Sequence, residues 1–212
     1  MEKDLERYTL PQRIFHWVNA VSIFLLLISG LAIYAPNLFA FMNLKTSTWF
    51  ELHMWLVPLF LGGVAFHIIH SAFFLDRLGY LWFGKAEQHR LATILRNFFG
   101  LTKEYPRLGK YHPAQILVHW GFFANLMALT LTGFIIWKPL RHLIPLRLFG
   151  LGWDFIFFNR ILHDFFTASL AAMIIGHVYF AVLIKKNWPD LKAMFTGKIP
   201  LEEYAKYHEI LD

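Results

Sequence analysis

The sequence contains no cysteine. This absence excludes structural disulfides, iron–sulfur clusters held by thiolates, and haem attached covalently through a C-x-x-C-H motif. Any metal ion in this protein must therefore be bound by histidine, methionine or carboxylate side chains.

Charged residues are also scarce, and long hydrophobic runs take their place. Charged residues make up 16% of the chain, against roughly 25% in soluble domains, while 57% of the residues are hydrophobic. Four runs are each long enough to cross a hydrocarbon core of about 30 Å, and they cover about 14–34, 50–75, 114–138 and 160–184. We therefore predict an all-α fold, a transmembrane four-helix bundle that forms one integral-membrane domain over residues 1–212.

The basic residues are unevenly distributed along the chain. Fifteen of the twenty Lys and Arg residues lie before the first run, between the second and third, or after the fourth. Because the cytoplasmic loops of membrane proteins are enriched in Lys and Arg, both termini are predicted to be cytoplasmic. This topology also accounts for the net charge of +6, so no nucleic-acid partner is predicted.

Two further hydrophobic segments lie outside the predicted spans. The segment HRLATILRNFFGL places its apolar side chains on one helical face, which predicts a helix at the membrane interface or against the ends of the spans. The loop Pro139–Asn159 is rich in Leu, Phe and Trp. We expect this loop to lie in the interface or to contact another subunit.

Histidines are unusually frequent in the predicted spans. Of eleven histidines, seven lie within these spans or at their ends: His16, His53, His67, His70, His119, His163 and His177. Polar side chains are costly in hydrocarbon, so intramembrane imidazoles usually face the protein interior and either bind a ligand or bond a neighbouring helix.

The spacing of these histidines predicts two sites at different depths. His163 and His177 are fourteen residues apart, so they point to nearly the same side of a helix and are separated by about 21 Å. The direction of each span places His53 level with His163, near the outer surface. It also places His16 near the depth of His177, closer to the cytoplasm.

Two stacked pairs of histidines match the axial ligands of two six-coordinate b haems inside a helical bundle. A rival arrangement replaces His16 by His67, because His67 follows His53 by fourteen residues. Helical periodicity does not distinguish the two arrangements.

Two arginines accompany the predicted ligands. Arg13 precedes His16 by three residues and Arg160 precedes His163 by three, so each arginine shares a helical face with its histidine. They are candidates for contacts with haem propionates. The other interpretation is that they form the positive flank of a span.

Several motifs resemble one known family. They are RIFHW at His16, LISGLAIYAP after it, ELHMW at His53, GKYHPAQ at Gly109–Gln115, and TGFIIWKP at the end of the third span. Together with the helix that carries His163 and His177, they resemble the cytochrome b (gamma) subunit of respiratory formate dehydrogenases. That family belongs to the membrane di-haem cytochromes b, which also serve hydrogenases and thiosulfate reductases. The resemblance covers nearly the whole chain.

The resemblance implies a ligand set and a quinone site. It implies that His16 and His177 bind the cytoplasmic-side haem b, that His53 and His163 bind the periplasmic-side haem b, and it favours His16 over His67. It also implies a site for menaquinone or another quinone beside the cytoplasmic-side haem, with His112 and Gln115 as candidates. The family carries Asn where this sequence has His112, so the donor to the quinone would here be an imidazole.

The resemblance also implies a function. The chain would be a multi-pass subunit of the bacterial cytoplasmic (inner) membrane that passes electrons from a periplasmic iron–sulfur (beta) subunit, and through it from a catalytic (alpha) subunit, to quinone on the cytoplasmic side. The complex would be an oligomer of heterotrimers, and this chain would not act on the primary substrate. Hydrogenases and thiosulfate or polysulfide reductases use similar anchors, so the donor stays open.

A function of another class is compatible with the same histidines. A transporter or proton channel relays protons through polar side chains inside a bundle. Light absorption distinguishes the two classes, because only a cytochrome shows haem bands.

Overall fold

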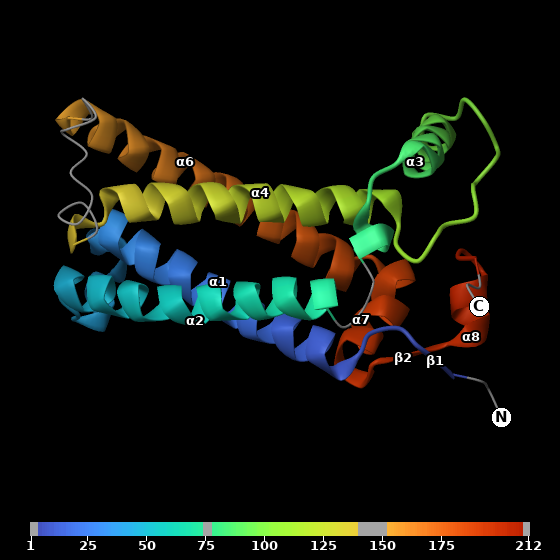
Figure 1. Ribbon diagram of the computed structural model, residues 1–212, viewed down its shortest axis with the longest axis horizontal. Helices are drawn as coiled ribbons and strands as arrows, with labels where there is room; N and C mark the ends of the chain where they lie inside the picture. The colour runs from blue at the N-terminus through green and yellow to red at the C-terminus, as the bar shows by residue number, and fades with distance from the viewer. Residues whose placement is uncertain (1–3, 74–77, 140–151, 210–212) are drawn as a thin grey trace. The chain divides into compact units, whose positions relative to one another are not determined.

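Four long helices dominate the computed structural model, which describes residues 4–73, 78–139 and 152–209. They are α1 (Leu10–Tyr34), α2 (Thr46–Phe73), α4 (Pro113–Ile136) and α6 (Trp153–Val178), the last extended by a π-helix over Tyr179–Leu183 (Figure 1). All four are long and apolar enough to cross a membrane, which confirms the predicted spans. Residues 140–151, the centre of the predicted hydrophobic loop, lie outside the described residues.

The helices begin earlier than hydropathy predicts, and the local reason is clear for α1 and α6. Helix α1 begins at Leu10 because the Thr9 backbone N–H donates to the side chain of Gln12 (3.0 Å) and Pro11 occupies the first turn. Helix α6 begins at Trp153 and carries Asp154 in its first turn. A carboxylate is unfavourable in hydrocarbon but favourable at a helix N-terminus, so hydropathy misses this turn.

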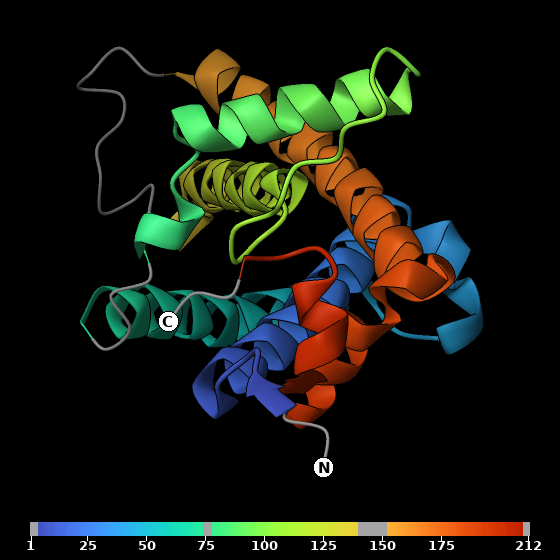
Figure 2. The ribbon, with the colours of Figure 1, turned by 90° about the vertical axis from the view of Figure 1, so that its right-hand side faces the viewer.

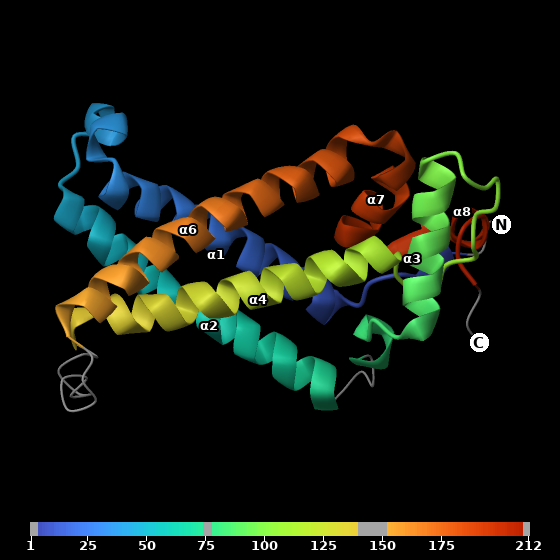
Figure 3. The same ribbon diagram turned by 90° about the horizontal axis from the view of Figure 1, so that it is seen from above.

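The chain forms two compact units. The first unit comprises Met1–Trp82, Arg107–Lys110 and Lys185–Asp212, and the second comprises Phe83–Pro106 and Tyr111–Ile184. In the first unit α1 and α2 pack as a helical hairpin, and in the second α4 and α6 pack in the same way (Figures 1 and 3). Each unit thus supplies two of the four spans.

The ends of the chain meet within the first unit. Strand β1 (Asp4–Glu6) pairs antiparallel with β2 (Lys198–Pro200), flanked by α7 (Trp188–Thr196) and α8 (Leu201–Ala205). Between α7 and β2, Gly197 adopts a left-handed conformation (φ 83°) that ends α7. Ala193, Ile199 and Tyr204 form a small buried core beside these strands. The N-terminal and C-terminal segments therefore lie side by side.

Helix α3 (Lys85–Phe98) lies across the axis of α4 in the second unit (Figures 2 and 3). The predicted apolar helix is therefore present. Its C-terminal end exposes Leu95, Phe98, Phe99 and Leu101, with Phe98 80% exposed. Short 3₁₀ helices cover Pro36–Met42, Leu78–Leu81 and Lys185–Asn187.

The buried residues of α1 are all small or polar, and those of α4 include polar side chains. Helix α1 buries Asn19, Ser22 and Ser29 together with Ala32, and α4 buries Asn125 and Thr132 among others. Large apolar side chains such as Phe24 and Leu131 are exposed. This distribution is the reverse of a soluble core and is typical of membrane helices, which pack through small and polar residues while apolar side chains face lipid.

Candidate histidine sites

His53 of α2 contacts a hydroxyl on the neighbouring helix. Its Nδ1 atom lies 2.9 Å from Ser29 Oγ of α1, and the same Oγ lies 2.8 Å from the carbonyl oxygen of Leu25. The carbonyl oxygen of Leu25 only accepts, so the single hydroxyl proton of Ser29 is donated to it. Ser29 must then accept from His53 Nδ1–H, and the lone pair of the neutral imidazole is on Nε2.

His163 of α6 has the same environment in the second unit. Its Nδ1 atom lies 3.0 Å from Thr132 Oγ1 of α4, and that Oγ1 lies 2.7 Å from the carbonyl oxygen of Ala128. The same reasoning places the ring proton of His163 on Nδ1 and the lone pair on Nε2. A neutral imidazole in this tautomer is the form that binds a metal ion through Nε2.

A glycine follows each of these hydroxyl residues. A Cβ atom added at Gly30 would lie 3.5 Å from His53 Cε1, and one added at Gly133 would lie 3.4 Å from His163 Cε1. Both distances are ordinary van der Waals contacts, so each imidazole lies close to the adjacent helix at its glycine. We call Ser29–Gly30 and Thr132–Gly133 the hydroxyl–glycine pairs.

The two hairpins repeat one pattern of residues. His16 and Trp17 precede Ser29–Gly30 in α1, and His119 and Trp120 precede Thr132–Gly133 in α4 at the same spacing. The second helix of each hairpin carries histidines fourteen residues apart. Sequence reasoning missed both hydroxyls, although this repeat was a signal that could have found them.

The other predicted ligands make ring contacts. In the first unit His16 packs edge-on against Trp17, with ring centroids 5.2 Å apart. In the second unit His177 of α6 packs edge-on against Phe122 of α4 at 6.0 Å. The predicted pairs His53/His163 and His16/His177 each take one histidine from each unit, and the pairing stays a prediction.

His67, the rival to His16, is held by α1. Its ring stacks on Phe15 with centroids 4.0 Å apart and an interplanar angle of 10°, and its Nδ1 lies 3.4 Å from Ser71 Oγ. Stacking of this kind fixes the ring between the two helices of the first unit. His70 stacks on Phe66 within its own helix.

The two predicted propionate contacts have different surroundings. Arg13 donates to the carbonyl oxygen of Phe195, near the end of α7, and its guanidinium packs beside Gly197. Arg160 lines a shallow hollow between the end of α4 and the start of α6, together with Trp153 and Phe157. Both roles toward propionates stay predictions.

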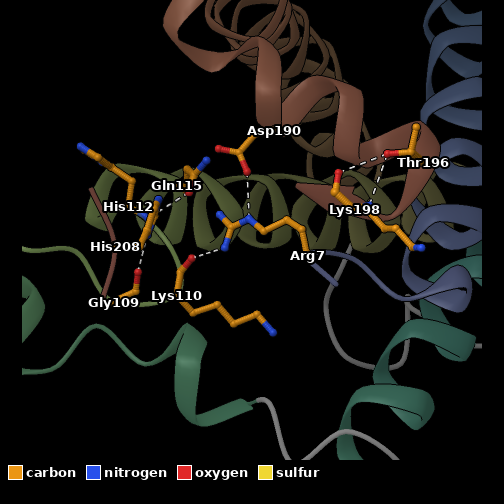
Figure 4. Close-up of polar contacts among 9 residues, drawn as sticks. All are labelled: Arg7, Gly109, Lys110, His112, Gln115, Asp190, Thr196, Lys198 and His208. Carbon is orange, nitrogen blue, oxygen red and sulfur yellow. Dashed lines mark hydrogen bonds and ion pairs between the residues drawn. The ribbon is translucent and has the colours of Figure 1, made fainter. Parts of the chain in front are cut away.

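His112 and Gln115, the predicted quinone residues, meet at the N-terminus of α4 (Figure 4). The backbone N–H of His112 donates to Gln115 Oε1 (2.9 Å), and His112 Nδ1 accepts from the backbone N–H of Ala114 (3.1 Å). These bonds form a capping box in which histidine replaces the usual serine or threonine. Because Nδ1 accepts, the proton of the neutral ring is on Nε2, opposite to the tautomer of His53.

A buried arginine, which sequence reasoning also missed, joins the ends of the chain in the first unit. Arg7 is 2% exposed, pairs through Nε with Asp190 of α7 (2.8 Å), and donates through Nη1 to the carbonyl oxygen of Lys110 (Figure 4). Burial alone would lower the pKa of Arg7, but the nearby Tyr8 and the Asp190 carboxylate outweigh it, so this pKa is raised.

His208 closes the same cluster. Its Nδ1 lies 2.6 Å from the carbonyl oxygen of Gly109, and its ring stacks on Tyr204 with centroids 4.6 Å apart. A carbonyl only accepts, so Nδ1 of His208 donates. Burial lowers the pKa of His208, because the charged form is less well solvated there.

Most of the chain matches one known protein family. The family model described as prokaryotic cytochrome b561 matches residues 7–197, a range that includes all four spans. The chain belongs to this family. It is an integral membrane protein of a cytochrome b family, and the family implies haem b.

Individual relatives confirm the resemblance predicted from the motifs. The chain is 28% identical to the formate dehydrogenase cytochrome b556(fdo) subunit of Escherichia coli, over 95% of this chain and 89% of the relative. It is 30% identical to the F420 non-reducing hydrogenase II cytochrome subunit of Methanosarcina mazei, over 94% and 84%. The nitrate-inducible formate dehydrogenase cytochrome b556(Fdn) subunit of Escherichia coli is 23% identical, over 97% and 89%.

The described side chains fit the haem that the family implies. Haem b without a covalent link needs an axial imidazole with its lone pair on Nε2 and its other nitrogen held by an acceptor. His53 and His163 meet both conditions in their own units, and apolar spans surround them.

Proposed function

We propose that this cytochrome is the membrane electron-transfer subunit of an oxidoreductase complex, and that it connects an iron–sulfur partner subunit on the outer side to a quinone on the cytoplasmic side. The observation that carries the proposal is the tautomer of His53 and His163, each fixed by a hydroxyl on the neighbouring helix. Haem b, when bound, supplies a one-electron carrier inside the membrane. The chain itself supplies ligands, an apolar surrounding and orientation.

The proposed ligand set comprises two pairs. His53 and His163 hold the outer haem, since the direction of their spans places both near the outer surface. His16 and His177 hold the inner haem. The stacking of His67 on Phe15 supports a packing role for His67 and thus the choice of His16.

The proposed orientation has both termini in the cytoplasm of a bacterium. The pairing of β1 with β2 supports a common side for the two ends. The excess of Lys and Arg in these ends and in the segment between α2 and α4 supports the cytoplasmic side. The iron–sulfur partner would then dock on the opposite, periplasmic surface.

The proposed quinone site includes His112 and Gln115. His112 carries its proton on Nε2, so it would donate a hydrogen bond to a quinone oxygen and pass on a proton taken from the cytoplasm. The capping bond to Gln115 would hold His112 in place during this exchange. Menaquinone or a related quinone fits this donor.

The proposed partner is the iron–sulfur subunit of a formate dehydrogenase, and through it a catalytic subunit. The two formate dehydrogenase relatives, which cover 95% and 97% of this chain, support this choice. A hydrogenase is the second candidate, because the Methanosarcina relative is a hydrogenase cytochrome subunit. Mass spectrometry of the complex purified through a tag on this chain would identify the partner.

Visible absorption of the purified chain tests the proposal. We expect a Soret band and α bands of b haem that sharpen and shift on addition of dithionite, with two haems per chain by the pyridine haemochrome assay. A chain without these bands, or with bands that dithionite does not change, would remove the electron-transfer function and leave the histidine relay of a transporter or channel.

A further inference from the structure

The two hydroxyl–glycine pairs carry an inference that rests on the proposed haem sites. We infer that Ser29 and Thr132 are positioning residues that act on the same haem, one through each of its axial imidazoles. They fix the tautomer of His53 and His163 and lower the reduction potential of that haem. The function of these hydroxyls would therefore be to tune an electron carrier, in addition to packing helices.

Burial makes each of these hydrogen bonds strong. Ser29 is 0% exposed and Thr132 is 5% exposed, and each hydroxyl donates its own proton to a carbonyl one turn earlier in its helix. In an interior of low dielectric constant, this donation polarises the hydroxyl and makes its oxygen a better acceptor. The imidazole Nδ1–H thus meets an acceptor of fixed position and enhanced strength.

The hydrogen bond changes the electron density on the iron ligand. An imidazole that donates through Nδ1–H becomes more basic at Nε2. A more basic axial ligand stabilises ferric over ferrous iron, so the haem is harder to reduce. Loss of the hydroxyl should therefore raise the reduction potential.

Bonding of a hydroxyl to its own helix is not sufficient for this role. Ser22 Oγ donates to Val18 (2.7 Å) and Thr130 Oγ1 donates to Leu126 (2.8 Å) in the same manner. Their hydrogen bonds within the described part of the chain go to their own helices, whereas Ser29 and Thr132 also bond an imidazole of the adjacent helix. Ser22 and Thr130 are therefore matched controls in α1 and α4.

The test is a spectroscopic redox titration of the purified full-length protein. We expect Thr132→Val and Ser29→Ala to raise the reduction potential of one and the same haem. At a fixed applied potential, the ratio of oxidised to reduced haem should change by at least about threefold. A threefold change corresponds to about 28 mV, since tenfold is 59 mV for one electron. The second haem, and both haems of Ser22→Ala and Thr130→Val, should keep their potentials.

A variant that retains the hydroxyl distinguishes an effect on the haem potential from an effect on helix packing. Thr132→Ser keeps the acceptor and loses a methyl group, so we expect the potential of the unmodified protein. If Thr132→Val releases the haem and Thr132→Ser retains it, dependence on the hydroxyl is supported. The inference is overturned if Thr132→Ser behaves like Thr132→Val, if neither Ser29→Ala nor Thr132→Val moves a potential, or if the two move different haems.

Variants of the two histidines test the haem ligands separately from the hydroxyls. His53→Ala and His163→Ala should each remove the same haem, and if they do not, the ligand assignment itself is wrong. If both remove that haem while the hydroxyl variants keep all potentials, the haem sites stand and only the positioning role of Ser29 and Thr132 is lost.

Discussion

At the scale of single residues, the chemistry of this protein depends on which nitrogen of each histidine carries the proton. His53 and His163 donate from Nδ1 to hydroxyls, which leaves Nε2 as a ligand atom. His112 accepts at Nδ1 from a backbone N–H, which leaves Nε2 as a donor. The same residue type thus presents either a lone pair or an N–H group at Nε2, according to the partner that its Nδ1 atom meets.

His208 provides a pH test at this scale. Burial lowers the pKa of His208, so on acidification the unfolded chain takes up a proton before the folded chain does. Its neutral, donating form contributes fully above the ordinary histidine pKa of about 6.5, and the stability is lost as the pH falls below that value toward the lower folded pKa. We expect the midpoint of thermal unfolding to fall between pH 7.5 and 5.5, as measured in detergent by loss of tryptophan fluorescence.

The control for this prediction is His208→Asn. Its amide is able to donate to the carbonyl oxygen of Gly109 but does not titrate, so the acid-induced fall should be smaller than in the unmodified protein. An equal fall in both proteins would show that His208 does not contribute to the pH dependence.

At the scale of elements, close packing of the first hairpin depends on glycine. A Cβ atom added at Gly63 of α2 would lie 2.6 Å from Asn19 Nδ2 of α1, and Asn19 is buried. One added at Gly62 meets nothing within 4 Å. Adjacent positions of one helix thus differ completely in the space available to a side chain.

Alanine substitutions at Gly63 and Gly62 should differ in their effect on stability. We expect Gly63→Ala to destabilise the first unit by about 1–3 kcal/mol, because Asn19 or the helix backbone must shift. Gly62→Ala should be neutral or stabilise by up to about 1 kcal/mol, because alanine favours a helix. Thermal unfolding of both variants in detergent checks this order, and a larger loss at Gly62 would contradict the observed packing of α1 on α2.

The spans could be predicted from the sequence, but the contacts between them could not. Hydropathy and spacing predicted four helices and the common face of His163 and His177, because both depend on residues within one helix. The partners Ser29 and Thr132 depend on how neighbouring helices rotate and cross, which periodicity does not determine. Both hydroxyls lie in motifs that carried the family resemblance, yet the motifs alone did not reveal that each contacts an imidazole.

The N-terminal segment could not be predicted for a related reason. Arg7 lies outside every span, and its sequence neighbours give no sign that it is buried. Its partners Asp190 and Lys110 are far away in the sequence. The capping box of α4 is easier to predict from the sequence, because His112, Pro113 and Gln115 follow the pattern of a helix start.

At the scale of the whole molecule, two helical hairpins of similar pattern account for the four spans. Each hairpin places a hydroxyl–glycine pair of its first helix against the first histidine of its second helix. Each hairpin thus presents one imidazole in the same tautomer, which supports the proposal that His53 and His163 are both haem ligands.

The haem content of purified His163→Ala, combined with its redox titration, tests the central claim most directly. The account predicts one b haem per chain instead of two, and this remaining inner haem is still reduced by quinol. Retention of two haems with unchanged potentials in His163→Ala would contradict the proposed ligand pairs.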